Sequence, residues 1–307
     1  MNRCALIALD WGTTRARAYR IDPGGRILDS RVDDLGVQKL GRVRFAEALD
    51  RLIAPWRDDP VPRIACGMIG SRQGWREAPY VNCPASLARL SGELVETDGG
   101  EIAIVPGLAT RDASGVPDVM RGEETQLLGA VAPDAPRRLV VLPGTHSKWA
   151  LVERGVVLDF ATFMTGELFD AMIGHTILGR LATASADPDG EAFARGVERG
   201  LGPGPTMHDV FGARTLALTG ELAAGGIREW LSGFVIGREV RSGRVWAQQA
   251  GDDASRVLIV GGEALAGRYA KALALAGAAG ERGPADAAAV GLYRMARAAG
   301  RVKEVFA

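Results

Sequence analysis

Short apolar runs that end in glycine-rich turns dominate the first third of the chain. The strands that we predict from such runs are 4–10, 15–21, 26–32, 63–66 and 102–106. Apolar side chains three and four residues apart predict a helix over 45–56. Residues 107–120 show neither period, and we predict a loop there.

The second half continues this mixture of strands and helices. We predict strands over 139–142, 148–152, 155–160 and 257–260, and helices over 121–131, 165–181, most of 191–241, and 284–299. The mixture indicates an α/β fold. The chain of 307 residues is long enough for two domains, and the sequence PDAPRR at 133–138 is the clearest linker. We therefore expect an N-terminal domain of 1–132, with 284–307 packed back on it, and a C-terminal domain of 133–283.

Composition excludes several classes of protein. Lys plus Arg equals Asp plus Glu at 37 each, so no overall field attracts nucleic acid or an anionic membrane. The three cysteines, Cys4, Cys66 and Cys83, have no Cys-x-x-Cys spacing, which argues against a zinc site and a disulfide framework. The apolar run that ends at Asp10 is too short for a signal peptide or a membrane span. We expect a cytoplasmic protein.

The first candidate for chemistry is the segment IALDWGTTRARAY at 7–19. A buried strand ends in Asp10, and Gly12, Thr13 and Thr14 form a tight turn before the next strand. Glycine permits close approach of an anion, and the two hydroxyl groups and the backbone amides can donate to phosphate oxygens. Asp10 could hold a magnesium ion through its waters. An ordinary β-hairpin explains this segment equally well when it is taken alone.

A second and a third segment of this kind favour the phosphate-binding interpretation over an ordinary hairpin. LVVLPGTHSKWALV at 139–152 repeats strand, turn and strand, and VLIVGGEALAGRYAKAL at 257–273 joins a strand to a helix through two glycines. The order and spacing resemble the actin-like ATPase superfamily, which includes the sugar kinases. That resemblance implies two actin-like (ribonuclease H-like) domains with a nucleotide cleft between them, in which both turns face one triphosphate and the domains close on substrate. The nucleotide-binding candidates are Gly12, Thr13, Thr14, Gly144, Thr145, Ser147, Lys148, Gly261, Gly262 and Glu263.

The segment GMIGSRQGWREAPYVNCP at 67–84 has no period and is rich in glycine, aromatic and charged residues. Such irregular segments are either functional or mobile. Aromatic side chains offer flat apolar surfaces, and arginine offers a planar fork for a carboxylate. We interpret it as a small-molecule site, and a surface loop held by two aromatic residues is the alternative. The substrate-binding candidates are Arg15, Ser71, Arg72, Trp75, Glu77 and Tyr80.

Phosphoryl transfer needs a carboxylate that takes the proton of the acceptor hydroxyl. In sugar kinases of the superfamily this group lies at the start of the helix that precedes the second turn, and here that position is Gly122-Glu123-Glu124. The resemblance implies that Glu123 is the base, with Glu124 as the other candidate. Many relatives have aspartate there. Acidic residues also stabilise the first turn of any helix, which is the structural alternative for both.

Six segments together resemble the 2-dehydro-3-deoxygalactonokinase family: DWGTTRARAY, GMIGSRQGWREAPYVNCPA, VPDVMRGEETQLLGA, LPGTHSKWALV, FMTGELFDAMIGHTILGRL and VGGEALAGRYAKAL. The resemblance implies an ATP- and Mg²⁺-dependent kinase that phosphorylates the terminal hydroxyl of a 2-keto-3-deoxy sugar acid, before an aldolase cleaves the product. The gluconate epimer is an alternative substrate. An actin-like ATPase that is not a kinase is a weaker alternative, and a sugar-sensing regulator is the weakest, because the chain starts with a strand. Whether copies of the chain form a homo-oligomer is left open.

Overall fold

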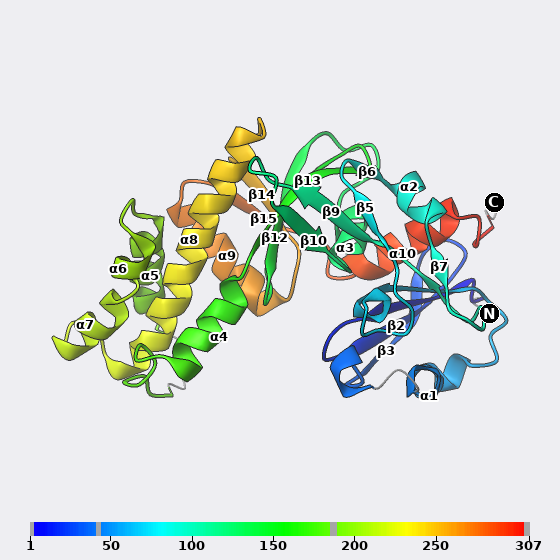
Figure 1. The fold of residues 1–307 in the computed structure, drawn as a ribbon, viewed down its shortest axis with the longest axis horizontal. Helices are drawn as coiled ribbons and strands as arrows, with labels where there is room; N and C mark the ends of the chain where they lie inside the picture. Colours follow the sequence, from blue (N-terminus) through cyan, green and yellow to red (C-terminus); the bar gives the residue numbers. More distant parts are fainter. Residues whose placement is uncertain (1–2, 41–43, 185–188, 304–307) are drawn as a thin grey trace. The chain divides into compact units, whose positions relative to one another are not determined.

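The computed structural model describes residues 3–40, 44–184 and 189–303. Its chain forms two compact units (Figure 1). Unit 1 comprises Met1–Arg137, Ala150–Phe160 and Pro284–Ala307, and unit 2 comprises Arg138–Trp149 and Ala161–Gly283. The parts of our predicted domains at 1–2, 41–43, 185–188 and 304–307 lie outside the described residues.

Each unit mixes helices and strands. The elements of unit 1 are β1 (Leu6–Trp11), β2 (Ala16–Ile21), β3 (Ile27–Asp33), α1 (Phe45–Leu52), β4 (Arg63–Gly67), β5 (Tyr80–Asn82), β6 (Ala85–Ser86), α2 (Leu87–Gly92), β7 (Val95–Glu96), β8 (Ala103–Ile104), β9 (Gly107–Arg111), β10 (Pro117–Met120), α3 (Glu123–Ala130) and α10 (Ala287–Ala298). Those of unit 2 are β11 (Arg138–Leu142), α4 (Thr165–His175), α5 (Gly190–Leu201), α6 (Thr206–Asp209), α7 (Gly212–Leu218), α8 (Ile227–Gln249), β14 (Arg256–Ile259), α9 (Glu263–Leu275) and β15 (Ala279–Arg282). Strands β12 (Ser147–Glu153) and β13 (Val156–Phe163) each contribute residues to both units.

The main sheet of unit 1 has the strand order β3-β2-β1-β4-β8-β7. Strand β1 pairs with β2 in the antiparallel direction and with β4 in the parallel direction. Five of the six residues of β1 are buried, as expected for a strand in the middle of a sheet, and only Asp10 is partly exposed. The strands that we predicted over 4–10, 15–21 and 26–32 are confirmed to within two residues.

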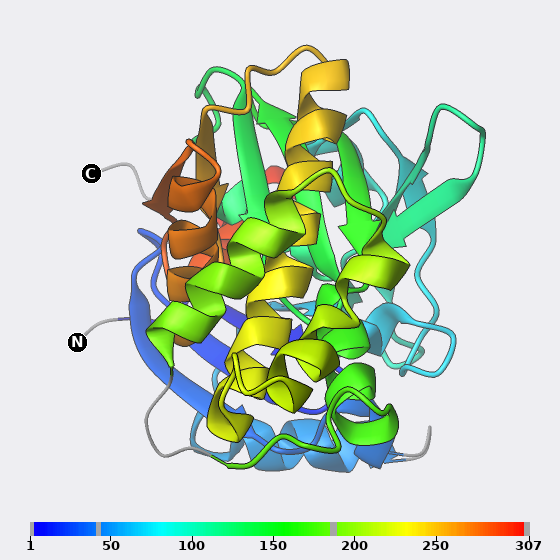
Figure 2. The same cartoon turned by 90° about the vertical axis from the view of Figure 1, so that its left-hand side faces the viewer.

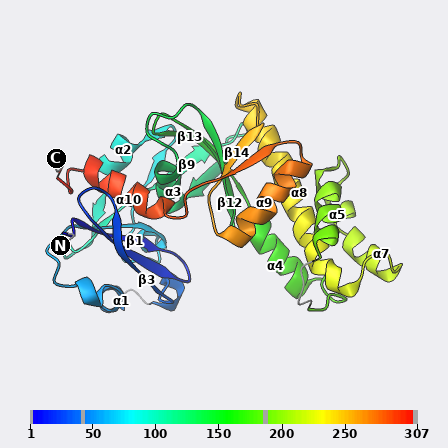
Figure 3. The ribbon, with the colours of Figure 1, turned by 180° about the vertical axis from the view of Figure 1, so that it is seen from behind.

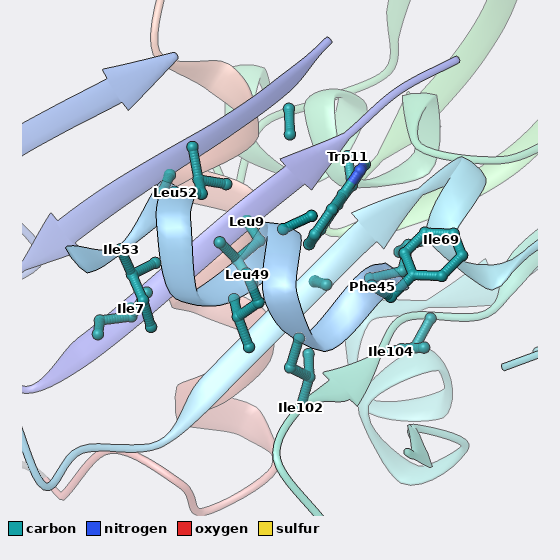
Figure 4. Close-up of a cluster of buried hydrophobic side chains, with 14 of the residues drawn as sticks. Ile7, Leu9, Trp11, Phe45, Leu49, Leu52, Ile53, Ile69, Ile102 and Ile104 are labelled. Atoms are coloured by element: carbon teal, nitrogen blue, oxygen red, sulfur yellow. The ribbon is translucent and has the colours of Figure 1, made fainter. Parts of the chain in front are cut away.

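Helix α1 packs on this sheet through one apolar face. Phe45, Leu49 and Leu52 are at most 2% exposed, and they join a core cluster that includes Trp11 (Figure 4). The rings of Trp11 and Phe45 lie 5.7 Å apart, and the ring of Trp75 stacks on Phe45 at 5.9 Å. The predicted helical spacing in this segment is therefore confirmed, and the cluster fixes the strand that carries Asp10.

Helix α10 packs closely against α3, and Figure 3 shows the two helices side by side. A Cβ atom on Gly129 would lie 1.8 Å from the Ala287 carbonyl oxygen, so only glycine allows this approach. Arg294 on α10 donates to carbonyls at the end of α3, including that of Val131 at 2.8 Å. The last helix therefore fixes the position of α3, whose first residue is Glu123.

The predicted loop at 107–120 is wrong. It forms a hairpin of β9 and β10, in a small sheet ordered β10-β9-β5. The turn is stabilised by the Asp112 carboxylate, which accepts from the amides of Ser114 and Val116 at 2.9 Å each. Gly115 supplies a positive φ of 82° in this turn. The two strands lack an apolar alternation, because most of their residues are not buried.

The third sheet has the strand order β15-β14-β11-β12-β13-β6. In unit 2, helices α5 and α8 cross closely (Figure 2). Their contact depends on glycine, since a Cβ on Gly196 would lie 2.1 Å from the Trp230 carbonyl oxygen. Helix α4 ends at His175 instead of the predicted residue 181. Thr176 follows it, and its hydroxyl group donates to the Met172 carbonyl at 2.7 Å and ends the helix.

Candidate active site

The turn after β1 is held by a neighbouring stretch of backbone. The Gly12 amide donates to the Arg15 carbonyl at 2.9 Å and closes the turn. The three carbonyls from Gly12 to Thr14 accept from the amides of residues 36–38. A Cβ on Gly36 would lie 2.2 Å from the Thr14 carbonyl carbon, so the approach requires glycine. The turn is fixed, and its residues Thr14 and Arg15 remain exposed.

Basic side chains surround a cavity beside this turn. The cavity has a volume of about 620 Å³ and is lined by Asp10, Gly12, Thr14, Arg15, Arg17, Asp34 and Lys39. Arg15 pairs with Asp34 at 3.2 Å, and Arg17 lies 3.9 Å from Asp10. Three cationic and two anionic side chains line the cavity, and the excess of positive charge suits a phosphate group. We did not predict Arg17 or Lys39, because single basic residues on a strand and in a loop carry no pattern.

The start of α3 lies against the ends of β1 and β4. Gly67 and Gly122 have φ angles of 92° and 108°, which other residues rarely adopt. A Cβ on Gly67 would lie 2.7 Å from the Trp11 carbonyl oxygen, and one on Gly122 would lie 3.1 Å from the Gly67 Cα. The two glycines let three segments meet, and they bring the first residues of α3 toward the end of β1.

Carboxyl groups lie close together where these three segments meet. Burial raises the pKa of Asp10, the nearby charge of Glu123 raises it further, and Arg17 opposes both effects. Cys66 at the end of β4 joins them, and its thiol donates to Asp10 Oδ1 at 4.0 Å. Burial raises the pKa of the Cys66 thiol well above its usual value. The structure therefore brings together Asp10 and Glu123, which we predicted for one site from segments more than one hundred residues apart.

Glu123 and Glu124 occupy different environments. Glu124 is 0% exposed; its Oε2 atom accepts from the Gly122 amide at 2.6 Å and its Oε1 atom accepts from the Thr125 hydroxyl at 3.1 Å. Burial, and then the charge of Glu123, raise the pKa of Glu124 to about 8. Glu123 is partly exposed, and it accepts from the Arg121 amide at 3.1 Å. At neutral pH, Glu124 is therefore a mostly protonated acid.

The predicted substrate residues do not share one cavity. Arg72, Trp75 and Glu77 line a cavity of about 470 Å³ with Gly74, Arg76 and Asp98, and Arg15 lines the cavity beside the first turn instead. Arg72 pairs with Glu77 at 3.6 Å, and both side chains are largely exposed. Trp75 also belongs to the core, through its stacking on Phe45. Tyr80 lies under the guanidinium of Arg121, 4.3 Å from the ring centre, and the Ser71 hydroxyl is buried.

The second turn, in unit 2, is held by the start of α4. The Glu167 amide donates to the Thr145 carbonyl at 3.0 Å, and the Glu167 carboxylate contacts the His146 ring. A Cβ on Gly166 would lie 2.5 Å from the Gly144 carbonyl oxygen. Lys148 is only 4% exposed, and its ammonium group donates to the His146 carbonyl at 3.1 Å. The side chain that we expected to add charge to the site is thus mostly buried.

A buried carboxyl group stands beside this turn. Ser147 Oγ accepts from the Gly144 amide at 3.4 Å and shares a hydrogen bond of 2.9 Å with the Tyr269 hydroxyl. Tyr269 donates in turn to Glu239 Oε2 at 2.5 Å, and the Trp149 indole donates to Glu239 Oε1 at 2.8 Å. Burial raises the pKa of Glu239, and these donors oppose that effect. We did not predict this network, because its members come from three separate elements.

The Gly-Gly turn after β14 belongs to the same edge of unit 2. Strands β11 and β14 are parallel neighbours, so the turns that follow them leave the sheet together. A Cβ on Gly261 would lie 3.6 Å from Pro143, the first residue of the second turn. Gly262 precedes Glu263, where α9 begins. Two of the three predicted nucleotide segments are therefore neighbours in unit 2, and Gly12–Thr14 belong to unit 1.

The described residues contain neither a cluster of metal-binding side chains nor a membrane-spanning helix. Within residues 3–40, 44–184 and 189–303, no three or more His, Cys, Asp or Glu side chains are arranged to hold a metal ion. In the same ranges, no helix combines the length and the apolar character that crossing a membrane requires. The three cysteines are free thiols.

The fold is that of the actin-like (ribonuclease H-like) ATPase class. The fold is shared with the activator of 2-hydroxyisocaproyl-CoA dehydratase from Clostridium difficile, solved with bound ADPNP, at a TM-score of 0.51 and 15% identity over 98% of each chain. A kinase of this class uses ATP as its phosphoryl donor.

The chain belongs to the 2-keto-3-deoxy-galactonokinase family, whose profile matches residues 10–295. It is 37% identical to the 2-dehydro-3-deoxygalactonokinase of Escherichia coli (strain K12) over 266 residues, which cover 87% of this chain and 88% of that protein. A crystal structure from Sinorhizobium meliloti, provisionally assigned the same activity, matches with a TM-score of 0.86 and 38% identity, over 95% of this chain and 98% of that one. The family that the sequence motifs indicated is confirmed.

Proposed function

We propose that this protein transfers the γ-phosphoryl group of ATP to the 6-hydroxyl of 2-dehydro-3-deoxy-D-galactonate. The product would be the 6-phosphate, which an aldolase cleaves in galactonate catabolism. The observation that carries the proposal is the family match over residues 10–295, together with the carboxylates of Asp10 and Glu123 at the end of β1. The absence of a membrane-spanning helix in the described residues and the three free thiols are compatible with a cytoplasmic enzyme.

Glu123 is the general base in this proposal. A base must be ionised and reachable, and Glu123 is partly exposed at the start of α3. Glu124 is fully buried, two donors from its own chain segment already contact it, and burial holds its pKa at about 8. A protonated carboxyl group cannot accept the hydroxyl proton. Glu124 instead stabilises the first turn of α3, which sets the direction of Glu123.

Asp10 is the magnesium-binding residue in this proposal. Magnesium is usually held by one or two carboxylates together with substrate phosphates and water, so a three-residue cluster is not required. The residues fit such an ion. Burial and the charge of Glu123 both raise the pKa of Asp10, and a bound cation would stabilise the ionised form of this carboxyl group. When bound, the ion would neutralise charge on the phosphates. Arg17 and Lys39 hold positive charge beside it.

We further propose that both glycine turns contact the triphosphate. In unit 1, the donors are Thr13, Thr14 and the backbone of the fixed turn, beside a cavity with excess positive charge. In unit 2, the donors are the backbone of Gly144 and Thr145, and the Gly261-Gly262 turn beside them would contact the nucleoside. Ser147 and Lys148 support the second turn from within, since each makes a hydrogen bond inside it.

A substrate panel tests the proposed function. The purified protein is given ATP and Mg²⁺ with 2-dehydro-3-deoxy-D-galactonate, its gluconate epimer, and neutral sugars of the same length, and ADP release is measured. We expect ADP release with the galactonate derivative, with a higher kcat/KM than with the epimer. A higher value for the epimer would move the assignment to that acid, and ADP release that no acid increases would contradict a kinase of sugar acids.

A further inference from the structure

Arg121 carries donors that the protein leaves unused. Its Nη2 group donates to the Ala78 carbonyl at 2.8 Å, but Nε and Nη1 are buried and have no hydrogen-bond partner among the described residues. Among the described residues, no acidic side chain forms a salt bridge with this guanidinium, and its charge counteracts the raised pKa of Glu124. Buried donors without acceptors are costly, so Nε and Nη1 need an explanation.

The Ser71 hydroxyl is a second buried polar group without a partner among the described residues. Both groups lie in one region, because Arg121 Nη1 would be 2.9 Å from a Cβ on Gly70, the neighbour of Ser71. The buried polar side-chain atoms of unit 1 that lack a partner in the described residues all belong to these two residues. A guanidinium with two unused donors and an unpartnered hydroxyl in the same region are what a site for a carboxylate requires.

The position of Arg121 ties this pair to the proposed chemistry. Its own amide donates to Glu123 Oε2 at 3.1 Å, so it precedes the proposed base by two residues. The ring of Tyr80 lies over the guanidinium, 4.3 Å from the ring centre, and is 45% exposed, so the pair lies near the protein surface.

We propose that Arg121 and Ser71 bind the carboxylate of the sugar acid and thereby select acids over neutral sugars. This inference rests on the proposed function, since it concerns the substrate of the same site. Arg72 and Arg15, which we named from the sequence, suit the role less well. Each is largely exposed and already pairs with an acidic neighbour, Glu77 or Asp34. An exposed, paired arginine gives little binding energy for an anion.

Ser71→Ala is the decisive variant. If the hydroxyl only fills space, removing this unpartnered buried hydroxyl leaves folding and catalysis unchanged. If it binds the carboxylate, we expect the KM for 2-dehydro-3-deoxy-D-galactonate to rise roughly 5- to 10-fold, with the KM for ATP unchanged. Arg121→Gln should raise the KM for the acid roughly 100-fold, and Arg121→Lys less than that. Arg72→Gln is the matched control, and we expect it to change the KM by less than about 3-fold.

The readout that separates recognition from folding is the preference for the acid over its carboxamide, measured as a ratio of kcat/KM values. Both the Ser71→Ala and Arg121→Gln variants should lower this ratio, whereas a purely structural defect would lower both rates equally. A ratio equal to that of the wild type in both variants would overturn the inference.

Binding of the acid without ATP, measured by calorimetry, separates this failure from a failure of the proposed function. A wild-type protein that binds the acid but does not phosphorylate it would contradict the function alone. Equal binding of the acid by the wild type and Ser71→Ala would contradict the inference alone.

Discussion

Each unit places a glycine-threonine turn between two strands. Each unit also buries a glutamate that accepts hydrogen bonds from neighbouring residues, Glu124 in unit 1 and Glu239 in unit 2. The two turns, however, are held in different ways. The turn at Gly12 is fixed by backbone from residues 36–38, and its charged neighbours line an open cavity. The turn at Gly144 is held by the Glu167 amide and also by side chains inside it, and Ser147 and Lys148 are almost fully buried. In the proposed function, unit 1 therefore supplies charge and the reactive carboxylates, whereas unit 2 supplies hydrogen-bond donors held by a buried network.

The largest expected effect concerns the reactive groups of unit 1. Glu123→Gln should lower kcat by about 10²- to 10⁴-fold while ATP binding is kept, because the variant removes the proposed base. Glu124→Gln is its control and should keep kcat within about 5-fold, since the amide is neutral like the protonated carboxyl group and its NH2 group can donate to the Thr125 hydroxyl. Steady-state kinetics with a nucleotide-binding titration make the comparison. A loss of kcat in Glu124→Gln alone would move the role of base to that residue.

The second prediction concerns the pH dependence of stability. The pKa of Glu124 rises from 4.5 to about 8 on folding, so the folded state keeps a proton that the unfolded state has lost between these values. Stability from this group is complete below about pH 4.5, and it falls by about 1.4 kcal/mol per pH unit as the pH rises toward 8. Urea unfolding of the wild type and Glu124→Gln at pH 5, 6, 7 and 8 measures it. The variant should show a flatter decline, and parallel curves would mean that Glu124 is ionised in the fold.

The third prediction concerns the buried hydrogen-bond network around Glu239 in unit 2. Glu239→Gln should raise the KM for ATP about 10-fold with a small change in kcat, because an amide cannot accept from both Trp149 and Tyr269. Tyr269→Phe removes one link to Ser147 and should have a weaker effect of the same kind. Asp209→Asn is a control for a buried carboxylate in the same unit, and it should lower stability without changing the KM for ATP. An equal KM in Glu239→Gln and the wild type would refute the supporting role.

The smallest expected effect concerns the exposed pair of His146 and Glu167. Both side chains are about half exposed, so the pair should contribute at most about 1 kcal/mol. Glu167→Gln should raise the KM for ATP no more than about 5-fold, and this rise should shrink at high salt. The test is kinetics at about 50 and about 500 mM salt, two concentrations at which the electrostatic screening length differs. A rise that is independent of salt would instead mean that the pair acts through the fold of the turn.

Much of this arrangement follows from local pattern. The apolar runs at 4–10 and 15–21 and the spacing of Phe45, Leu49 and Leu52 predict β1, β2 and α1, because burial acts on alternating or helically spaced residues. The hairpin at β9 and β10 was missed because its strands are largely not buried, so only the turn around Asp112 and Gly115 marks it. Short strand β15 was missed for the same reason, since its four residues AGER carry no apolar run.

The details of the site depend on tertiary packing, which local pattern does not reveal. Glu123 and Glu124 look alike in sequence, and the rotation of α3 against β4 and α10 decides that only Glu124 is buried. Arg121 resembles any arginine before a helix, and its unused donors become visible only when the loop around Gly70 encloses it. Motifs therefore predicted the residues that we propose for phosphate binding and proton transfer, while the proposed carboxylate site required the packed structure.

Amide hydrogen exchange tests most directly whether both turns hold one triphosphate. The protein is compared with and without a nonhydrolysable ATP analogue and Mg²⁺, and exchange is followed in peptides that contain residues 12–15 and 144–147. Slower exchange in both peptides is the predicted result, with little change in the β9–β10 hairpin. Slower exchange in only one of the two turns, or in neither, would contradict the account.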